Sequence, residues 1–414
     1  MTLMASSFSN KIKPLLAILA SVYTIQSLIG MFTLQGLPAV MRSEGISTSQ
    51  IGLFYLAMLP WGLKFLWSPY IERQRKQGSV FFRHAVIIIL AQFCMVAMLV
   101  LLSLTSAVSH LNAVFACVLV LTLASTFADI TADGLAVDQL PVKKRYLGNI
   151  MQVGGAYCGA VFGGGLFIYV MGFVSWQYAL LILAALVLIM SLPTWSLFRM
   201  KEVSLSANVE DAKPSLSKSL QNPLVRTGLV LVIVSQLGTR GALSMMMPFL
   251  YDQGIGLANL GLLVAGGGVL TGLVGVAFGG WLVKQVSAIK AIYLLLVVEA
   301  ITFSLLALYS AQVFTLDWGL EALFILNSVV SAAKFVALYT LMMDYAYGTQ
   351  SGVDFSMFQS MDMLVAIATA MICGVIIERF GYLYHYGFLV TFTCIAMACI
   401  NKLIGSTQDT VEAQ

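Results

Sequence analysis

The sequence predicts an all-α integral membrane protein of about twelve transmembrane helices, arranged as two pseudo-symmetric bundles of six. Three observations lead to this expectation: the composition, the recurrence of long apolar stretches and an internal repeat. Of 414 residues, 60% are hydrophobic and 10% are charged. A soluble domain usually has about 45–50% apolar and about 25% charged residues, so a soluble core does not account for this chain.

Apolar stretches of about 20 residues recur along the whole chain, and each is long enough to cross a hydrocarbon core about 30 Å thick as a helix. The first follows Lys11 and Lys13, as the core of a signal peptide would. It is too long for such a core and further spans follow at once, so we expect it to remain as the first helix. The expected spans lie near residues 14–41, 50–70, 84–106, 113–140, 147–171, 176–197, 224–250, 255–282, 289–311, 318–343, 353–377 and 382–404.

The basic residues orient these spans. With the N-terminus inside, seventeen of the 22 Lys and Arg residues fall in segments on the cytoplasmic side, and only Arg42 and Arg379 fall outside. Cytoplasmic loops of membrane proteins are enriched in Lys and Arg. We therefore expect a multi-pass protein with both termini in the cytoplasm, surrounded by lipid. In a soluble protein the net charge of +4 would suggest a nucleic-acid partner, but here the placement of the basic residues in cytoplasmic segments accounts for them, so we expect no nucleic-acid partner.

An internal repeat divides the chain into halves. Gly45 and Gly254 are 209 residues apart, and so are Gly172 and Gly381 near the other end of each half. The longest polar stretch lies between the halves. Parallel repeats of six helices are found in secondary transporters. We expect an N-terminal bundle over residues 1–198, a cytoplasmic linker over 199–222 and a C-terminal bundle over 223–414.

Glycines are concentrated in the fifth and eighth expected helices, many of them at four-residue spacing. Small residues at this spacing let helix backbones approach closely. We expect these two helices to touch each other where the halves move during transport. Static packing inside each bundle would explain the same pattern.

The sequence contains none of the common hydrolase, nucleotide-binding and zinc-binding motifs. There is no GxSxG, Walker A or HExxH motif, and the three histidines are scattered. All six cysteines lie inside expected spans without a CxxC pair. We therefore expect no enzymatic activity, no metal site and no cofactor.

Ionisable residues deep in the membrane are the informative ones, because each costs at least a few kcal/mol unless it is paired or hydrated. Asp129 and Asp133 are four residues apart and so share one face of the fourth expected helix, with Asp133 about 6 Å closer to the cytoplasm. Lys64, in the second expected helix, lies at a similar depth. We expect Lys64 to pair with one of these carboxylates, either as a structural clamp or as a gate that opens on protonation.

Arg240 lies near the middle of the seventh expected helix, with Gln236 one turn away on the same face. A guanidinium keeps its charge and offers five donors, which suits an anionic or carboxylate-bearing substrate. We expect Arg240 and Gln236 to bind substrate. The alternative is a permanent pair between Arg240 and a buried acid, Glu299 or Asp362.

The remaining charges at depth have less certain roles. Asp362 and Lys334 are expected either to neutralise each other or to leave Asp362 as a proton-carrying carboxylate. Glu299 lies on a helix that is usually peripheral, so we expect a structural pair or a water-filled notch there. Three residues of the first two expected helices are candidate contacts to an aromatic or amphipathic ligand, although such residues also serve for packing: Tyr23, Gln26 and Trp61.

The segment LKFLWSPYIER, residues 63–73, resembles the KFLWAPLLDR-like signature of the AmpG-like permeases in the major facilitator superfamily. The resemblance implies a gating turn in which Glu72, Arg73 and Arg75 take the roles of the acid and basic residues of that family. Glu72 stands where Asp is more usual, which keeps the charge. The equivalent turn of the second half, around residues 281–284, lacks the acid and the arginine, so an ionic latch is expected in the first half alone.

Two further segments extend the resemblance. ASTFADITADGLAVDQL, residues 124–140, looks like the fourth helix of those permeases, and residues 337–366 are similar to the RhtX/FptX branch, whose members import ferric siderophores. The resemblance implies a monomeric secondary transporter of the bacterial inner membrane. It would import a siderophore or its iron complex by alternating access, driven by protons. Muropeptide uptake and efflux of a small amphipathic molecule are alternatives, whereas buried charges and twin repeats disfavour a scaffold that does not transport.

Overall fold

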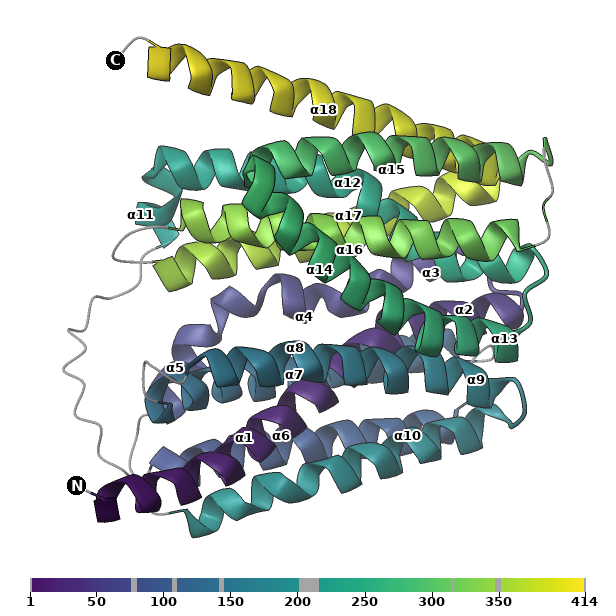
Figure 1. The fold of residues 1–414 in the computed structure, drawn as a ribbon. Coiled ribbons are helices and arrows are strands. Elements are labelled where there is room, and N and C mark those ends of the chain that lie inside the picture. The colour runs from purple at the N-terminus through teal and green to yellow at the C-terminus, as the bar shows by residue number, and fades with distance from the viewer. Residues whose placement is uncertain are drawn as a thin grey trace. The chain divides into compact units, whose positions relative to one another are not determined.

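The computed structural model describes residues 2–75, 80–105, 110–140, 145–200, 216–313, 316, 318–346 and 351–412. The described residues form helices and contain no strand (Figure 1). Within them, eleven helices are long and apolar enough to cross a membrane. These eleven coincide with the first and the third to twelfth expected spans, so the all-α membrane architecture is confirmed.

The second expected span differs from the prediction, because the chain does not form one continuous helix over residues 50–70. Pro60 and Pro69 each lack a backbone N–H, and a proline ring clashes with the preceding turn of a helix, so an α-helix breaks at such positions. Gly62 adds a residue with low helix propensity. The segment consists of α3 (Thr48–Phe54), η2 (Tyr55–Met58), α4 (Leu59–Gly62), η3 (Lys64–Leu66) and α5 (Ser68–Arg75).

The chain divides into two compact units, of which unit 1 comprises residues 1–44, 57–211 and 256–265. In unit 1, α1 packs against α7 and α8, and α6 packs against α7 and α10 (Figure 1). Its other helices are the short α4, η3 and α5 described above and α13 (Leu257–Leu262). The main elements are α1 (Thr2–Met31), η1 (Phe32–Gly36), α2 (Leu37–Ser43), α6 (Val80–Ser103), α7 (Leu111–Gln139), α8 (Arg145–Gly159), η5 (Ala160–Leu166), α9 (Phe167–Met171), α10 (Trp176–Ser191) and η6 (Leu192–Arg199).

Unit 2 comprises residues 45–56, 212–255 and 266–414. Its α12 packs against α17 and α18, α15 packs against α16 and α18, and α14 packs against α16 (Figure 1). A core of buried aliphatic side chains from α12, α15, α16 and α18 joins these helices. The elements are α3, already described, with α11 (Leu216–Gln221), α12 (Pro223–Asp252), α14 (Val269–Val286), α15 (Ala288–Ser310), α16 (Gly319–Tyr345), α17 (Ser351–Phe380) and α18 (Tyr382–Glu412). The π-helix η7 (Leu263–Gly268) begins in unit 1 and ends in unit 2.

The backbone carries the internal repeat that the sequence predicts. Thr48 begins α3 and Leu257 begins α13, which reproduces the offset of 209 residues. Gly45 and Gly254 precede these helices with φ angles of 82° and 95°, a left-handed conformation that glycine adopts without steric cost. Each repeat-related segment belongs to the unit built mainly from the other half of the chain. Boundaries at residues 198 and 223 follow chain order and stay a prediction.

The glycines of the fifth and eighth expected helices serve two kinds of contact. As predicted, the two helices touch inside unit 1: a methyl group added at Gly165 would lie 2.5 Å from the Cβ of Ala265, and Gly261 lies against the backbone of α9. Gly159, by contrast, lies against Ser27 of α1. The predicted contact is confirmed, while its role in movement stays a prediction.

Candidate functional site

The charged residues expected at membrane depth gather into two clusters, one in each unit. We call the first the unit 1 acid cluster; it consists of Tyr23, Lys64, Asp129 and Asp133. The second is the unit 2 charge network, which consists of Gln236, Arg240, Glu299, Lys334 and Asp362.

Arg240 of α12 forms a forked ion pair with Asp362 of α17. Its Nε–H donates to Asp362 Oδ1 at 2.9 Å, and its Nη2 donates to Asp362 Oδ2. Gln236 Nε2 also donates to Asp362 Oδ1, at 2.9 Å. The pair that the sequence left as the alternative for Arg240 is therefore present. The Arg240 side chain nevertheless keeps 16% of its surface exposed, against 3% for Asp362.

Lys334 of α16 and Glu299 of α15 form a second ion pair, which is buried completely. Lys334 Nζ donates to Glu299 Oε2 at 2.6 Å and to the backbone oxygen of Ser235 at 2.9 Å. Thr239 Oγ1 donates to Glu299 Oε1 at 2.6 Å. The side chains of Lys334 and Glu299 are 0% and 1% exposed. For Glu299 the sequence left open a structural ion pair or a water-filled notch, and the structure shows the ion pair.

The partners within the network differ from one prediction, which paired Asp362 with Lys334. The register of α12 explains the difference. Gln236 and Arg240 are one turn apart and face Asp362, whereas Thr239 hydrogen-bonds Glu299 and Ser235 receives Lys334. Two adjacent rows of one helix thus distribute the charges between α17 on one side and α15 and α16 on the other.

An aromatic ring of unit 2 lies against the guanidinium of Arg240, and the sequence did not single it out. The Arg240 Cζ atom lies 4.7 Å from the centroid of the Phe335 ring, within the range of a cation–π interaction. The ring of Tyr339, one turn further along α16, is 6.4 Å from that of Phe335. The hydroxyl of Tyr55 donates to the backbone oxygen of Ser244, on the same helix as Arg240, at 3.1 Å. The four-residue spacing of Phe335 and Tyr339 was the available signal.

In unit 1, Lys64 pairs with Asp129, as the sequence predicted for one of two carboxylates. The Lys64 Nζ to Asp129 Oδ2 distance is 3.2 Å, and the ammonium lies 5.1 Å from the centroid of the Trp61 ring. Tyr23 Oη donates to Asp133 Oδ1 at 2.8 Å. Tyr23 is only 2% exposed, so its hydroxyl contacts a carboxylate of the protein, where the sequence suggested a ligand.

Two of the residues predicted to contact a ligand, Gln26 and Trp61, each have a buried polar atom that makes no hydrogen bond to the described residues. These atoms are Gln26 Oε1 and Trp61 Nε1. Leaving such an atom unpaired costs about 1–3 kcal/mol, which a substrate or a water molecule would offset. The backbone of α5 contains Glu72, Arg73 and Arg75, but their side chains lie outside the described part, so the gating turn stays a prediction.

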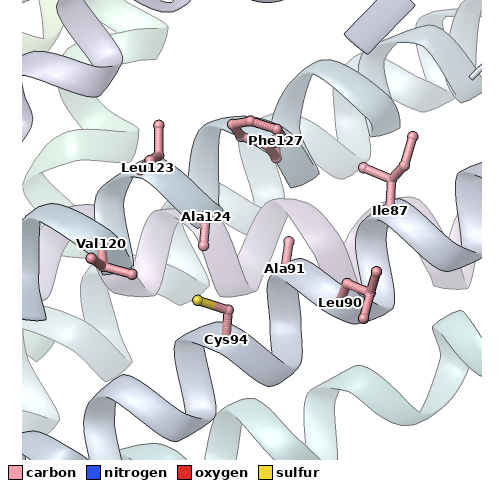
Figure 2. A pocket seen from close by; sticks show the side chains of 8 residues that line it. All are labelled: Ile87, Leu90, Ala91, Cys94, Val120, Leu123, Ala124 and Phe127. Carbon is pink, nitrogen blue, oxygen red and sulfur yellow. The ribbon is translucent and has the colours of Figure 1, made fainter. Parts of the chain in front are cut away.

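A cavity of about 320 Å³ lies between α6 and α7 (Figure 2). Its lining is apolar, from Ile87 at one end to Phe127 on the facing helix, with the thiol of Cys94 as the exception. Leu90, at its edge, is 64% exposed. This hollow contains no charged group and so lacks the chemistry for a polar substrate.

The sequence model described as Major Facilitator Superfamily matches residues 16–370. The chain belongs to the major facilitator superfamily. It is therefore a membrane transporter by family and not a member of an enzyme family.

Within the superfamily, the chain is 22% identical over 415 residues to an uncharacterized protein of Haemophilus influenzae, covering 96% of each chain. It is 24% identical over 378 residues to the anhydromuropeptide permease of Escherichia coli K12, covering 86% of this chain and 72% of the permease. The latter match is consistent with the resemblance to AmpG-like permeases. The assignment to the RhtX/FptX branch stays a prediction.

Two solved structures have the same fold. A point mutant of the nucleoside transporter NupG superposes with a TM-score of 0.73 at 12% identity, covering 94% of this chain and 98% of that one. A bacterial homologue of the human lysosomal transporter Spinster, in an inward-facing and unoccupied conformation, superposes with a TM-score of 0.70 at 15% identity, covering 95% and 96%. At these identities, the likeness establishes the fold alone.

Proposed function

We propose that this transporter imports a siderophore or a ferric siderophore across the bacterial inner membrane by alternating access, coupled to protons. The observation that carries the proposal is Arg240, a permanent cation in an expected membrane span whose side chain keeps 16% of its surface exposed. The siderophore class is supported by the similarity of residues 337–366 to the RhtX/FptX branch.

The hydrogen bonds of Arg240 support a role in binding an anion. Its pair with Asp362 uses two of the five N–H donors, and the described residues supply no acceptor for the other three. A carboxylate or hydroxamate of the substrate would accept from these donors. The ring of Phe335 covers one face of the guanidinium and would restrict the anion to its edge. Gln236, which donates to Asp362, would fix the orientation of that carboxylate.

The second candidate substrate is an anhydromuropeptide. The match to the Escherichia coli permease over 86% of this chain favours it. Muropeptides also carry peptide carboxylates, so Arg240 would bind them by the same chemistry. Efflux of a small amphipathic molecule uses the same fold in the opposite direction and has no comparable support.

Growth under iron limitation tests the proposal. A strain without the transporter should fail to grow on one or more purified ferric siderophores, and a plasmid with the wild-type gene should restore growth. The same strains should take up a labelled anhydromuropeptide equally well. Loss of muropeptide uptake with unchanged growth on every ferric siderophore would replace the first candidate with the second.

A further inference from the structure

Within the two clusters of described residues, positive and negative charges are equal in number in the unit 2 charge network and unequal in the unit 1 acid cluster. Two cations and two carboxylates form the unit 2 charge network, whereas the unit 1 acid cluster has one cation and two carboxylates. The described ion pairs at this depth are Lys64 with Asp129, Arg240 with Asp362 and Lys334 with Glu299. The carboxylate without a cation of its own is Asp133.

Asp133 is held by a neutral group. Its Oδ1 accepts from Tyr23 Oη at 2.8 Å, and it makes no ion pair within the part of the chain that the structure describes. Asp129, one turn away, is 2% exposed and takes the ammonium of Lys64. Asp133 itself keeps part of its surface exposed. It therefore differs from Asp129, Asp362 and Glu299 in both ion pairing and exposure.

We propose that Asp133, positioned by Tyr23, is the residue that carries the coupling proton. The use of this proton in transport rests on the proposed function, whereas the site itself does not. A proton from water binds to a carboxylate oxygen of Asp133, which becomes a neutral acid, and the acid returns the proton to water after the transporter has changed conformation. Tyr23 keeps its own proton and remains hydrogen-bonded in both states.

Protonation of Asp133 removes the excess negative charge of the unit 1 acid cluster. An uncompensated carboxylate at membrane depth is costly to shield from water, whereas a neutral acid bonded to a phenol is much less so. The titratable groups that act on Asp133 are Tyr23 from α1, Lys64 from η3 and Asp129 from α7 itself. The neighbouring α6 adds His84, which is buried, and the ionic side chains of α5 lie outside the described residues.

Infrared difference spectroscopy of the purified protein tests the site with protons as the only ligand. Lowering the pH protonates carboxyl groups throughout the protein. The carbonyl stretch of Asp133 should be a band that the wild type shows and the Asp133→Asn variant lacks. Asp362→Asn should leave the band in place, because Asp362 belongs to the unit 2 charge network and accepts from Arg240 and Gln236 there. Tyr23→Phe should move the band to higher frequency, because the acid loses its hydrogen-bond partner. Elution volume and melting temperature establish that each variant is folded.

Carboxyl bands that are identical in the wild type and in folded Asp133→Asn protein would overturn the proposal. If Asp133→Asn protein does not fold, Tyr23→Phe decides, since an unchanged frequency would place the proton elsewhere. If the Asp133 band is present but uptake does not respond to an imposed proton gradient, Asp133 is a proton-binding site and the proton coupling of the proposed function is refuted.

Discussion

Removing the ammonium of Lys334 should destabilise the protein severely. Lys334→Met would leave the Glu299 carboxylate, which is 1% exposed, with the Thr239 hydroxyl as its described partner. Removing one member of a buried ion pair costs about 3–5 kcal/mol, because the other charge stays buried without compensation. We therefore expect the free energy of unfolding to fall by about 3–5 kcal/mol in the single variant.

The double variant Lys334→Met, Glu299→Leu distinguishes the net contribution of the ion pair to stability from the cost of leaving one buried charge unpaired. Apolar replacement of both members of a buried pair is often neutral or stabilising. The double variant should therefore be closer to the wild type than the Lys334→Met variant is, with a strong coupling between the two sites. The assay is denaturant unfolding in detergent, with Lys284→Met as the matched control, because Lys284 is exposed near the end of α14. A Lys334→Met protein as stable as that control would refute the reasoning.

The remaining predictions address topology, the gating turn and helix packing. Reporter fusions at Asn112 and Gln414 should report the periplasm and the cytoplasm, and a swap would overturn the orientation argument. Glu72→Gln should slow uptake and leave substrate binding largely intact, whereas a collapse of binding would assign the turn to folding or to the site. Gly52→Ala should lower the melting temperature, because the added methyl group would lie 2.5 Å from a backbone oxygen of α17. Gly154→Ala is the control, because Gly154 has open space around it. Equal melting temperatures of the two variants would contradict the close packing of Gly52.

Local spacing predicted the relations within single helices. Asp129 and Asp133 share a face of α7 as their four-residue separation requires, and Gln236 and Arg240 likewise share a face of α12. The expectation that Lys64 would pair with that face of α7 is confirmed. Whether Lys64 pairs with Asp129 or Asp133 depends on the path of the chain through η3. That path was not predictable because Pro60 and Pro69 interrupt the second expected helix.

Pairing between helices was not predictable in the same way. The rotation of α12, α15, α16 and α17 about their axes decides whether Lys334 meets Asp362 or Glu299, and hydrophobic periodicity does not fix that rotation when a helix is apolar on most sides. Phe335 and Tyr339 were missed for the same reason. Residues 45–56 belong to unit 2 and residues 256–265 to unit 1. This assignment depends on tertiary contacts, which the hydropathy of the sequence does not reveal.

The central claim is that the protein accumulates an anionic substrate through Arg240. The most direct measurement is uptake of a ferric siderophore containing radioactive iron into proteoliposomes under an inward proton gradient. Wild-type vesicles should accumulate the label beyond equilibration, Arg240→Lys vesicles should accumulate less, and Arg240→Ala vesicles should match vesicles without protein. Folded Arg240→Ala protein that accumulates the label as fast as the wild type would contradict the account.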